Sequence, residues 1–415
     1  MINFEINFPT SYSNCEKDAL FEKIIDEKRQ EKSGYYDLPY SDRSIRDCAA
    51  YIQANQKILR GLKHLVIIGI GGSSLGLKAL DTMLYHLPHR NDISVKFLEH
   101  TDPLRIQKSL KKICVHSSLF IVISKSGKTI ETISLMKYCL WRYDLTSAPL
   151  RKRLLVISDE DSVLLQWAKQ NDIFNIAIAP NIGGRFSVLS AVGLVPLRLL
   201  GYKIEEILHG ARILQDSFIA RREEHILEKA LFMAHNHNSF PMNILFSYSS
   251  SFKDFNLWYV QLWGESLGKI NTSGSNMGLT PLGLIGSIDQ HSFLQLILEG
   301  KRDKTITFLG VNQKHYADLV IPDITMVGIE GTDFVNNKAF AKLLATQQLA
   351  TMRVLQERGL PIDSIQIDLL TEKNLGALIM YYELLTSAVG CLFEVDTYNQ
   401  PAVERGKELL RHLFS

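Results

Sequence analysis

Short apolar runs rich in β-branched residues alternate with longer segments in which apolar residues recur at helical spacing. In the first half of the chain these runs lie at residues 64–70, 94–98, 119–124, 153–158 and 174–179. Runs of this length are typical of buried strands, and the segments between them are long enough for helices. Repeated strand–helix units of this kind predict a parallel sheet with helices on both faces.

The same alternation begins again in the second half of the chain. Further strands are expected at 241–248, 305–311 and 318–322. Helices are expected at 187–200, 203–234 (a charged connector), 337–358, 374–393 and 401–413. We therefore predict an α/β protein with two stacked, doubly wound units wrapped by helical arms.

The length of the chain agrees with two units, because single cores rarely grow beyond about 250–300 residues and this chain has 415. No internal sequence repeat and no low-complexity linker is recognised. The predicted division is an N-terminal helical segment at 1–60, α/β domains at 61–202 and 203–394, and a C-terminal helix at 395–415 that completes the site.

Composition argues against several classes of protein. The 46 basic and 44 acidic residues are nearly balanced, whereas binding to nucleic acid needs a concentrated positive surface. The five cysteines are widely spaced, which suits a reducing compartment and neither a disulfide framework nor a zinc site. We recognise no signal peptide and no apolar stretch of about 18 residues that could span a membrane. A soluble, cytoplasmic protein is expected.

A cluster of hydroxyl groups follows the predicted strand that ends near residue 123. Residues 124–132 read SKSGKTIET and carry the hydroxyls of Ser124, Ser126 and Thr129 beside a glycine. Hydroxyls, backbone N–H groups and a helix N-terminus together favour a site for a phosphate monoester. The alternative is an ordinary helix N-cap near Thr129.

A second glycine-rich turn, GIGGSS at 69–74, follows the first predicted strand, which begins at residue 64. Neither turn is a nucleotide motif. The loop at 124–132 lacks the glycine that a Walker A loop needs before its Gly-Lys pair, and Ser74 occupies the third small position of a dinucleotide fingerprint. Because the ends of neighbouring parallel strands meet at one edge of a sheet, we expect both turns to lie together.

Polar residues interrupt two apolar segments. In GGRFS at 183–187, Arg185 follows two glycines and could reach into a cleft, although most arginines are solvated at the surface. In LWYVQLWGESLGK at 257–269, Gln261 and Glu265 are four residues apart and would share one face of a helix. Glu265 suits a general base. The alternative is a surface glutamate paired with Lys269.

Two further candidates lie nearer the C-terminus. His291, in DQHS at 289–292, is expected to open a helix that runs toward Gly300. Lys407 is expected about two turns into the last helix, after the segment YNQP at 398–401. A single histidine is more often structural than catalytic, and a lysine near the end of a helix is normally solvated.

Six segments in order resemble the glucose-6-phosphate isomerase family. They are GIGGSSLG at 69–76, SKSGKTIET at 124–132, GGRFSVLSAVGLVP at 183–196, ESLGK at 265–269, DQHSFLQ at 289–295 and NQPAVERGK at 399–407. The resemblance spans roughly residues 60–410 and is of the compact bacterial type. It implies two sugar-isomerase-type (SIS) α/β domains with parallel sheets and an active site between them.

The resemblance also implies a reaction, the reversible isomerisation of glucose 6-phosphate and fructose 6-phosphate in glycolysis and gluconeogenesis. Glu265 would move a proton between C1 and C2 through a cis-enediolate that Arg185 stabilises. His291, assisted by Lys407, would open the sugar ring. Gln261 would hydrogen-bond the sugar hydroxyls, and Gln400 would lie near the phosphate. The residues implied to bind the substrate are Gly72, Ser73, Ser124, Lys125, Ser126, Thr129, Gln261 and Gln400.

The family further implies a homodimer in which His291 comes from the partner subunit, with no cofactor, no metal, no nucleic acid and no membrane. Two other functions remain open at this point. A non-catalytic sugar-phosphate-binding module would need the loop at 124–132 but not the four catalytic candidates together. A dual phosphoglucose/phosphomannose isomerase would also act on mannose 6-phosphate. The chain departs from the family pattern at Ser126, where Thr is common, and at Asn399, where Asp is frequent.

Overall fold

The computed structural model describes residues 2–8, 12–312 and 319–414. Its first sheet is parallel and has the strand order β3-β2-β4-β5-β6. The five strands are β2 (His64–Ile68), β3 (Ser94–Leu98), β4 (Ser118–Ile123), β5 (Leu154–Asp159) and β6 (Phe174–Ile178). Each predicted strand is present, and no end is displaced by more than two residues.

The second sheet has the order β1-β12-β11-β7-β10, in which only β1 runs antiparallel to its neighbour. Its strands are β1 (Ile2–Asn7), β7 (Met242–Ser247), β10 (Thr280–Ile285), β11 (Lys304–Val311) and β12 (Ile362–Ile367). Strands β7 and β11 were predicted. The strand predicted at 318–322 is wrong over residues 319–322, where only an isolated bridge joins Val320 to Ala339; Asp318 lies outside the described residues.

Sequence analysis missed three strands of this sheet. Strand β10 contains Pro281 and Gly283, two residue types that strands disfavour. The proline is tolerated because β10 lies at an edge of the sheet. Strand β12 contains Asp363, which is buried in an ion pair with Lys229. Strand β1 is polar at alternate positions. Each departs from the apolar run that a buried strand normally shows.

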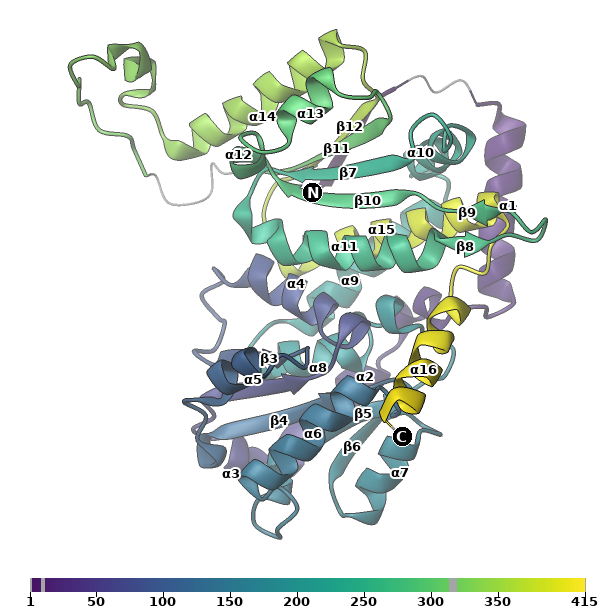
Figure 1. Ribbon diagram of the computed structural model, residues 1–415, viewed down its shortest axis with the longest axis vertical. Coiled ribbons are helices and arrows are strands. Elements are labelled where there is room, and N and C mark those ends of the chain that lie inside the picture. The colour runs from purple at the N-terminus through teal and green to yellow at the C-terminus, as the bar shows by residue number, and fades with distance from the viewer. Residues whose placement is uncertain (1, 9–11, 313–318, 415) are drawn as a thin grey trace.

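The two sheets share one topology although the sequence shows no repeat. The order β3-β2-β4-β5 in the first sheet corresponds to β10-β7-β11-β12 in the second, in the same chain order. The helices that follow the corresponding strands β2 and β7 are α4 (Leu75–Leu84) and α11 (Lys253–Leu267). These two helices pack against each other where the two units meet (Figure 1). This arrangement supports our proposal that the chain divides near residue 202.

Alternate residues of the central strands enter different cores. In β4, Leu119 and Ile121 face the core between the sheets, whereas Phe120 and Val122 face the outer helices. The outer helices of the first sheet are α5 (Pro103–Leu110), α6 (Ile130–Tyr143) and α7 (Val163–Gln170). Figure 1 shows α11 and α15 (Glu372–Phe393) as a layer between the two sheets. The predicted fold class, parallel sheets covered by helices on both faces, is confirmed.

The remaining helices complete the wrapping. They are α1 (Asn14–Arg29), α2 (Arg43–Ala54), α3 (Gln56–Leu59), α8 (Ala191–Leu199), α9 (Ile204–Ile219), α10 (Glu224–His235), α12 (Gly286–Asp289), α13 (Leu294–Glu299), α14 (Phe340–Glu357) and α16 (Glu404–Phe414). The charged connector predicted at 203–234 consists of α9 and α10. The helix predicted to run from residue 289 toward Gly300 is interrupted, because α12 ends at Asp289 and α13 begins only at Leu294.

Helix α15 is, by length and composition, apolar enough to cross a membrane, so the expectation that the chain has no such stretch is wrong. However, 89% of its apolar window is buried inside the fold. It packs closely on α9: a methyl group added to Gly376 would lie 1.9 Å from the carbonyl oxygen of Ile207. Helix α15 is therefore a core helix of the protein.

This close contact predicts that Gly376→Ala destabilises the protein. Because a backbone carbonyl blocks the added methyl, the two helices must separate, and we expect the free energy of unfolding in urea to fall by about 1–3 kcal/mol or more. Gly406→Ala is the matched control, since nothing lies within 4 Å of a methyl group added there on α16. An equal effect of both substitutions would contradict the proposed packing constraint.

Candidate active site

The two predicted glycine turns lie together at the carboxyl edge of the first sheet, because β2 and β4 are neighbours. The turn after β2 also touches two other segments. Gly71 has a left-handed backbone (φ +57°), and a methyl group there would lie 2.6 Å from Nε2 of Gln261. A methyl group on Gly72 would lie 2.2 Å from the carbonyl of Gly184. Glycine is therefore required where three segments meet.

The loop after β4 has the hydroxyl groups that were predicted to hold phosphate. Ser124 is buried and its hydroxyl donates to Oγ1 of Thr129 at 3.3 Å. The backbone N–H of Lys128 donates to Oγ of Ser126 at 3.2 Å. Thr129 is the N-cap residue of α6, but its side chain makes no capping bond. Thr129 therefore lies at the N-cap position, as the alternative expected, but its hydroxyl does not make the hydrogen bond of an ordinary N-cap.

Buried groups support this loop from the adjacent strand end. The hydroxyl of Ser158 donates to the carbonyl oxygens of Ser124 and Lys125, and the N–H of Asp159 also donates to the Lys125 carbonyl. Burial lowers the pKa of the Lys125 ammonium, and nearby Arg185 lowers it further, whereas Asp159 opposes the change. Burial also raises the pKa of Asp159 to about 6. The loop is therefore fixed from the strand end, and the ammonium of its own Lys125 lies near the guanidinium of Arg185.

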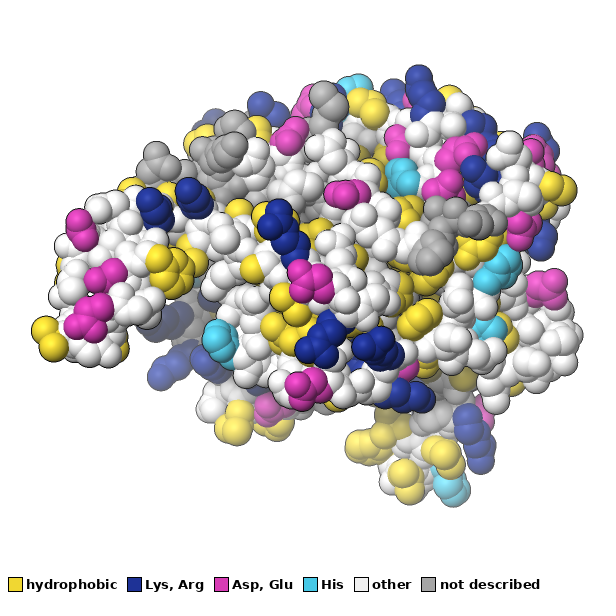
Figure 2. Space-filling model, turned by 90° about the horizontal axis from the view of Figure 1, so that it is seen from above, with side chains coloured by type: hydrophobic (Ala, Val, Ile, Leu, Met, Phe, Trp, Pro, Cys, Tyr) yellow, Lys and Arg dark blue, Asp and Glu magenta, His cyan; other side chains and the backbone are white. Residues whose placement is uncertain are grey.

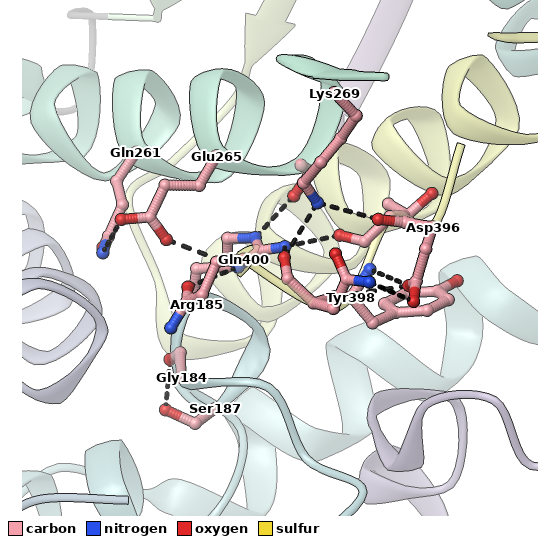
Figure 3. Close-up of polar contacts among 12 residues, drawn as sticks. Gly184, Arg185, Ser187, Gln261, Glu265, Lys269, Asp396, Tyr398 and Gln400 are labelled. Atoms are coloured by element: carbon pink, nitrogen blue, oxygen red, sulfur yellow. Dashed lines mark hydrogen bonds and ion pairs between the residues drawn. The ribbon is translucent and has the colours of Figure 1, made fainter. Parts of the chain in front are cut away.

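Arg185 lies at the centre of the site, and its side chain is only 1% exposed. All of its N–H groups point at protein acceptors (Figure 3). These acceptors are Oγ of Ser266, Oε2 of Glu265, Oε1 of Gln400 and the carbonyl oxygens of Thr397 and Asn399. The alternative of a solvated surface arginine is wrong.

Burial of Arg185 has an electrostatic consequence. Removal from water lowers the pKa of its guanidinium, and the ion pair with Glu265 opposes that shift. An arginine nevertheless stays protonated in proteins. A positive charge is therefore fixed in a partly dry site, where its interaction with a developing negative charge is stronger than in water.

Glu265 is accessible to a ligand, because 41% of its side chain is exposed. Its Oε1 accepts from Nε2 of Gln261 at 3.2 Å, and its Oε2 accepts from Nη1 of Arg185 at 3.3 Å. The predicted sharing of one helix face by Gln261 and Glu265 is confirmed. The alternative partner of Glu265, Lys269, instead donates to two backbone carbonyls of the C-terminal segment.

Two predicted catalytic residues lie apart from this cluster. His291 is exposed in the turn between α12 and α13, and so does not open a helix. Lys407 is on α16, and its Nζ pairs with Oε1 of Glu404 at 2.6 Å. Within the described ranges, no hydrogen bond or ion pair joins either side chain to the Glu265–Arg185 cluster. One chain in this conformation therefore brings together only part of the predicted site.

Several residues of the cluster were not predicted as part of a site. Ser266 accepts from Arg185, and Lys269 donates to a carbonyl of the C-terminal segment. Tyr398 anchors the same segment by a hydrogen bond to Glu27. All lie inside or beside the motifs ESLGK and YNQP, so their positions in sequence were a usable signal. Among the residues described, no group of three or more His, Cys, Asp or Glu side chains is placed to hold a metal ion.

Comparison with known proteins identifies the family. The family model for phosphoglucose isomerase matches residues 45–415, which is most of the chain. The chain belongs to the phosphoglucose isomerase family. It is 39% identical to a glucose-6-phosphate isomerase of Campylobacter jejuni, over 99% of this chain and 97% of that protein. It is 34% identical to one of Methanocaldococcus jannaschii, over 99% and 94%. The predicted enzyme class, an aldose–ketose isomerase, is confirmed.

Solved structures agree on the phosphoglucose isomerase fold. A hypothetical protein of Thermus thermophilus superposes with a TM-score of 0.89 at 28% identity, and all of both chains is covered. A glucose-6-phosphate isomerase of Chlamydia trachomatis superposes with a TM-score of 0.83 at 20% identity, over all of this chain and 88% of that one. The predicted α/β fold of the SIS type is the fold of these two solved structures.

The close approach of the turn at 71–73 to Arg185 can be tested with Gly72→Ala. The added methyl would meet the backbone of Gly184 and push the turn away from Arg185. We expect a loss of roughly 1–3 kcal/mol in the free energy of unfolding and a parallel loss of isomerase activity.

Gly184→Ala is the matched control, because a methyl group added to Gly184 meets nothing within 4 Å. Its melting temperature should stay close to that of the wild type. If Gly72→Ala also melts like the wild type and keeps its activity, the turn does not need the close approach.

Proposed function

We propose that the Glu265–Arg185 pair carries the interconversion of glucose 6-phosphate and fructose 6-phosphate that the family comparison assigns to this chain. The observation that supports it most directly is an accessible carboxylate 3.3 Å from Nη1 of a buried guanidinium. Moving a proton next to a carbonyl group requires one positioned base and one positive group at the developing oxyanion. These two residues supply both.

The phosphate of the sugar binds the two glycine turns in this proposal. The hydroxyls of Ser73, Ser124, Ser126 and Thr129 donate hydrogen bonds to its oxygens, and the N-terminus of α6 adds backbone N–H donors. Lys125 contributes its backbone, and its ammonium adds positive charge close by. Gly72 lets the backbone approach the ligand closely. Binding at this end directs the other end of the open-chain sugar toward Glu265.

Proton transfer then takes place along one face of the sugar. Glu265 removes the proton from C2 of the open-chain aldose, and the C–H electrons form the C1=C2 bond of a cis-enediolate whose negative charge lies on the C1 oxygen. The proton of the C2 hydroxyl moves to the C1 oxygen, and Glu265 returns its proton to C1, which leaves the carbonyl group at C2. Nη1 of Arg185 donates to two side chains, Glu265 and Gln400, whereas Nε and Nη2 are bonded to Ser266 and to backbone. The enediolate oxygen can therefore replace a side-chain partner at Nη1 without turning the guanidinium. Gln261 hydrogen-bonds the sugar hydroxyls beside Glu265.

Ring opening requires two groups that are distant from Glu265 in this conformation. We assign it to His291 of the partner subunit in a homodimer, assisted by Lys407. Helix α16 is exposed along almost its whole length, so little packing opposes a movement that carries Lys407 toward a bound sugar. His291 is itself exposed on an outer turn, available to a neighbouring chain.

An exposed apolar arm, residues 319–339, supports the dimer. It projects from the second domain beside α14, and Figure 2 shows hydrophobic side chains on its surface. The largest exposed ones are Leu319, Val320, Ile324, Met326, Val327, Ile329 and Phe334. Apolar surface of this extent is typical of a protein–protein interface. A second copy of the chain that covers the arm would also bring its own surface turns, such as the one that carries His291, close to the first copy.

The remaining assignments follow from the same function. The enzyme is placed in the cytoplasm, where its sugar phosphates are found, and it needs no metal or cofactor for the proton transfer. A non-catalytic sugar-phosphate-binding module is disfavoured by the family and by the Glu265–Arg185 pair, which phosphate binding alone does not require. Activity on mannose 6-phosphate can be measured in the same assay.

Glu265→Gln tests the base. The amide keeps the size of the side chain, and its oxygen can still accept from Arg185, but it cannot take up the proton. We expect the conversion of fructose 6-phosphate to glucose 6-phosphate to fall by about 10²–10⁴-fold, measured in a coupled assay with EDTA. Glu206→Gln, on the exposed face of α9, is the control and should keep full activity. Near-normal turnover of Glu265→Gln would show that another group is the base.

Subunit exchange tests whether the site is shared. Glu265→Gln and His291→Ala enzymes, each first shown to be strongly impaired, are mixed in equal amounts and allowed to exchange subunits. Random pairing makes about half the dimers hybrids, each with one site that carries neither defect. Activity should therefore rise to about a quarter of that of the wild type. With complete exchange verified by native mass spectrometry, no recovery means that each site is built within one chain.

A further inference from the structure

The C-terminal segment at residues 396–400 enters the site between α11 and the turn that carries Arg185. The carboxylate of Asp396 folds it into a tight turn, since Oδ1 accepts from the backbone N–H groups of Tyr398 and Asn399 at 3.0 and 3.3 Å. The side chain of Asn399 donates to Oδ2 of the same carboxylate. An aspartate at position 399 could not make this last bond while ionised.

Two cations hold the carbonyl oxygens of this turn (Figure 3). Nζ of Lys269 donates to the carbonyls of Asp396 and Asn399 at 2.7 and 2.8 Å. Nη2 of Arg185 donates to the carbonyl of Asn399 at 3.0 Å and to that of Thr397. The carbonyl of Asn399 is thus shared by both cations, and Lys269 is connected to Arg185 through a single peptide group.

A second anchor holds the same turn from its other side. The hydroxyl of Tyr398 donates to Oε2 of Glu27 at 2.5 Å and lies 3.0 Å from Oγ of Ser387. Glu27 is on α1 and Ser387 on α15, so the anchor connects the turn with the rigid core. The turn is therefore fixed on two sides. Its backbone carbonyls bond to the cations of the site, and the side chain of Tyr398 bonds to the core.

We propose that Lys269 is a positioning residue of the isomerase: its ammonium fixes the turn at 396–400 and thereby orients Gln400 and Arg185 toward Glu265. The proposal rests on the proposed function of the Glu265–Arg185 pair. Lys269 itself need not touch the sugar. It lies in the short strand β8 (Lys269–Ile270), directly after α11, and this strand pairs with β9 (Asn276–Met277). Its backbone is thus held independently of its side chain.

The charge of Lys269 makes this role sensitive to pH. Burial is the main cause that lowers the pKa of its ammonium to about 8, and Arg185 lowers it further. Asp396 and Glu265 face it as well and oppose the shift. As the pH rises through 8 the ammonium becomes a neutral amine, and its hydrogen bonds to the two carbonyls lose their charge assistance. The turn should therefore loosen on the alkaline side.

The first experiment compares Lys269→Met and Lys269→Arg with the wild type. Met keeps the apolar length but not the donor, and we expect kcat to fall about 10–100-fold while KM changes much less. Arg keeps the charge and can donate to both carbonyls, so it should restore most of kcat. The matched control is Lys253→Met at the exposed start of α11, the helix that precedes β8, and this variant should be fully active.

The second experiment is the pH profile of kcat between pH 6 and 10. In the wild type an alkaline decline with an apparent pKa near 8 is expected from Lys269, and Lys269→Arg should remove or displace that decline. A purely structural role would change stability but not this profile. An alkaline limb that is the same in Lys269→Arg and the wild type overturns the proposal, and this comparison stands even if Lys269→Met does not fold.

Coupling to Tyr398 provides a third readout. If both residues act by fixing one turn, the loss in Lys269→Met combined with Tyr398→Phe should be smaller than the product of the two separate losses in kcat. Independent effects would contradict a shared turn. An inactive wild-type enzyme would instead overturn the proposed function, and an active wild type with an unchanged kcat in folded Lys269→Met overturns only the role of Lys269.

Discussion

The site depends on one buried positive charge that must be satisfied from every direction. Taking a guanidinium out of water is costly unless its N–H groups all find acceptors. Those of Arg185 reach Glu265 and Ser266 on α11 and three residues of the C-terminal segment, while Arg185 itself lies on a third segment, the turn at 184–186. Segments from three distant parts of the sequence are therefore held around one group. The same requirement orients the guanidinium, because only Nη1 has partners that a ligand can replace.

The arrangement of the two sheets brings these segments within reach of each other. Both units place their loops at the carboxyl ends of parallel strands, and the units pack through corresponding helices, α4 and α11. Glycines at 71 and 72 let the first loop touch α11 and the turn before Arg185 without a side chain between them. Glu265, the proposed base, and the two loops proposed to hold phosphate thus come from different units but meet in one place.

Much of this could be predicted from the local pattern of the chain. The central strands of the first sheet, β2, β4 and β5, are nearly continuous apolar runs because both of their faces are buried, and such runs are recognisable. The loop at 124–132 and the shared helix face of Gln261 and Glu265 follow from spacing alone. Strands β10 and β12 could not be recognised, because an edge position tolerates Pro281 and an ion pair with Lys229 lets Asp363 be buried.

The sequence by itself determined the fold class, the family and most of the residues that approach one another in the site. Only the tertiary structure decided that Arg185 is buried rather than solvated, that Lys269 binds backbone carbonyls rather than Glu265, and that His291 and Lys407 stand apart from the Glu265–Arg185 pair. The physical reason is that spacing along a chain specifies which side chains share a face. The partner of a charged group depends instead on which acceptors distant segments bring to it once water is excluded.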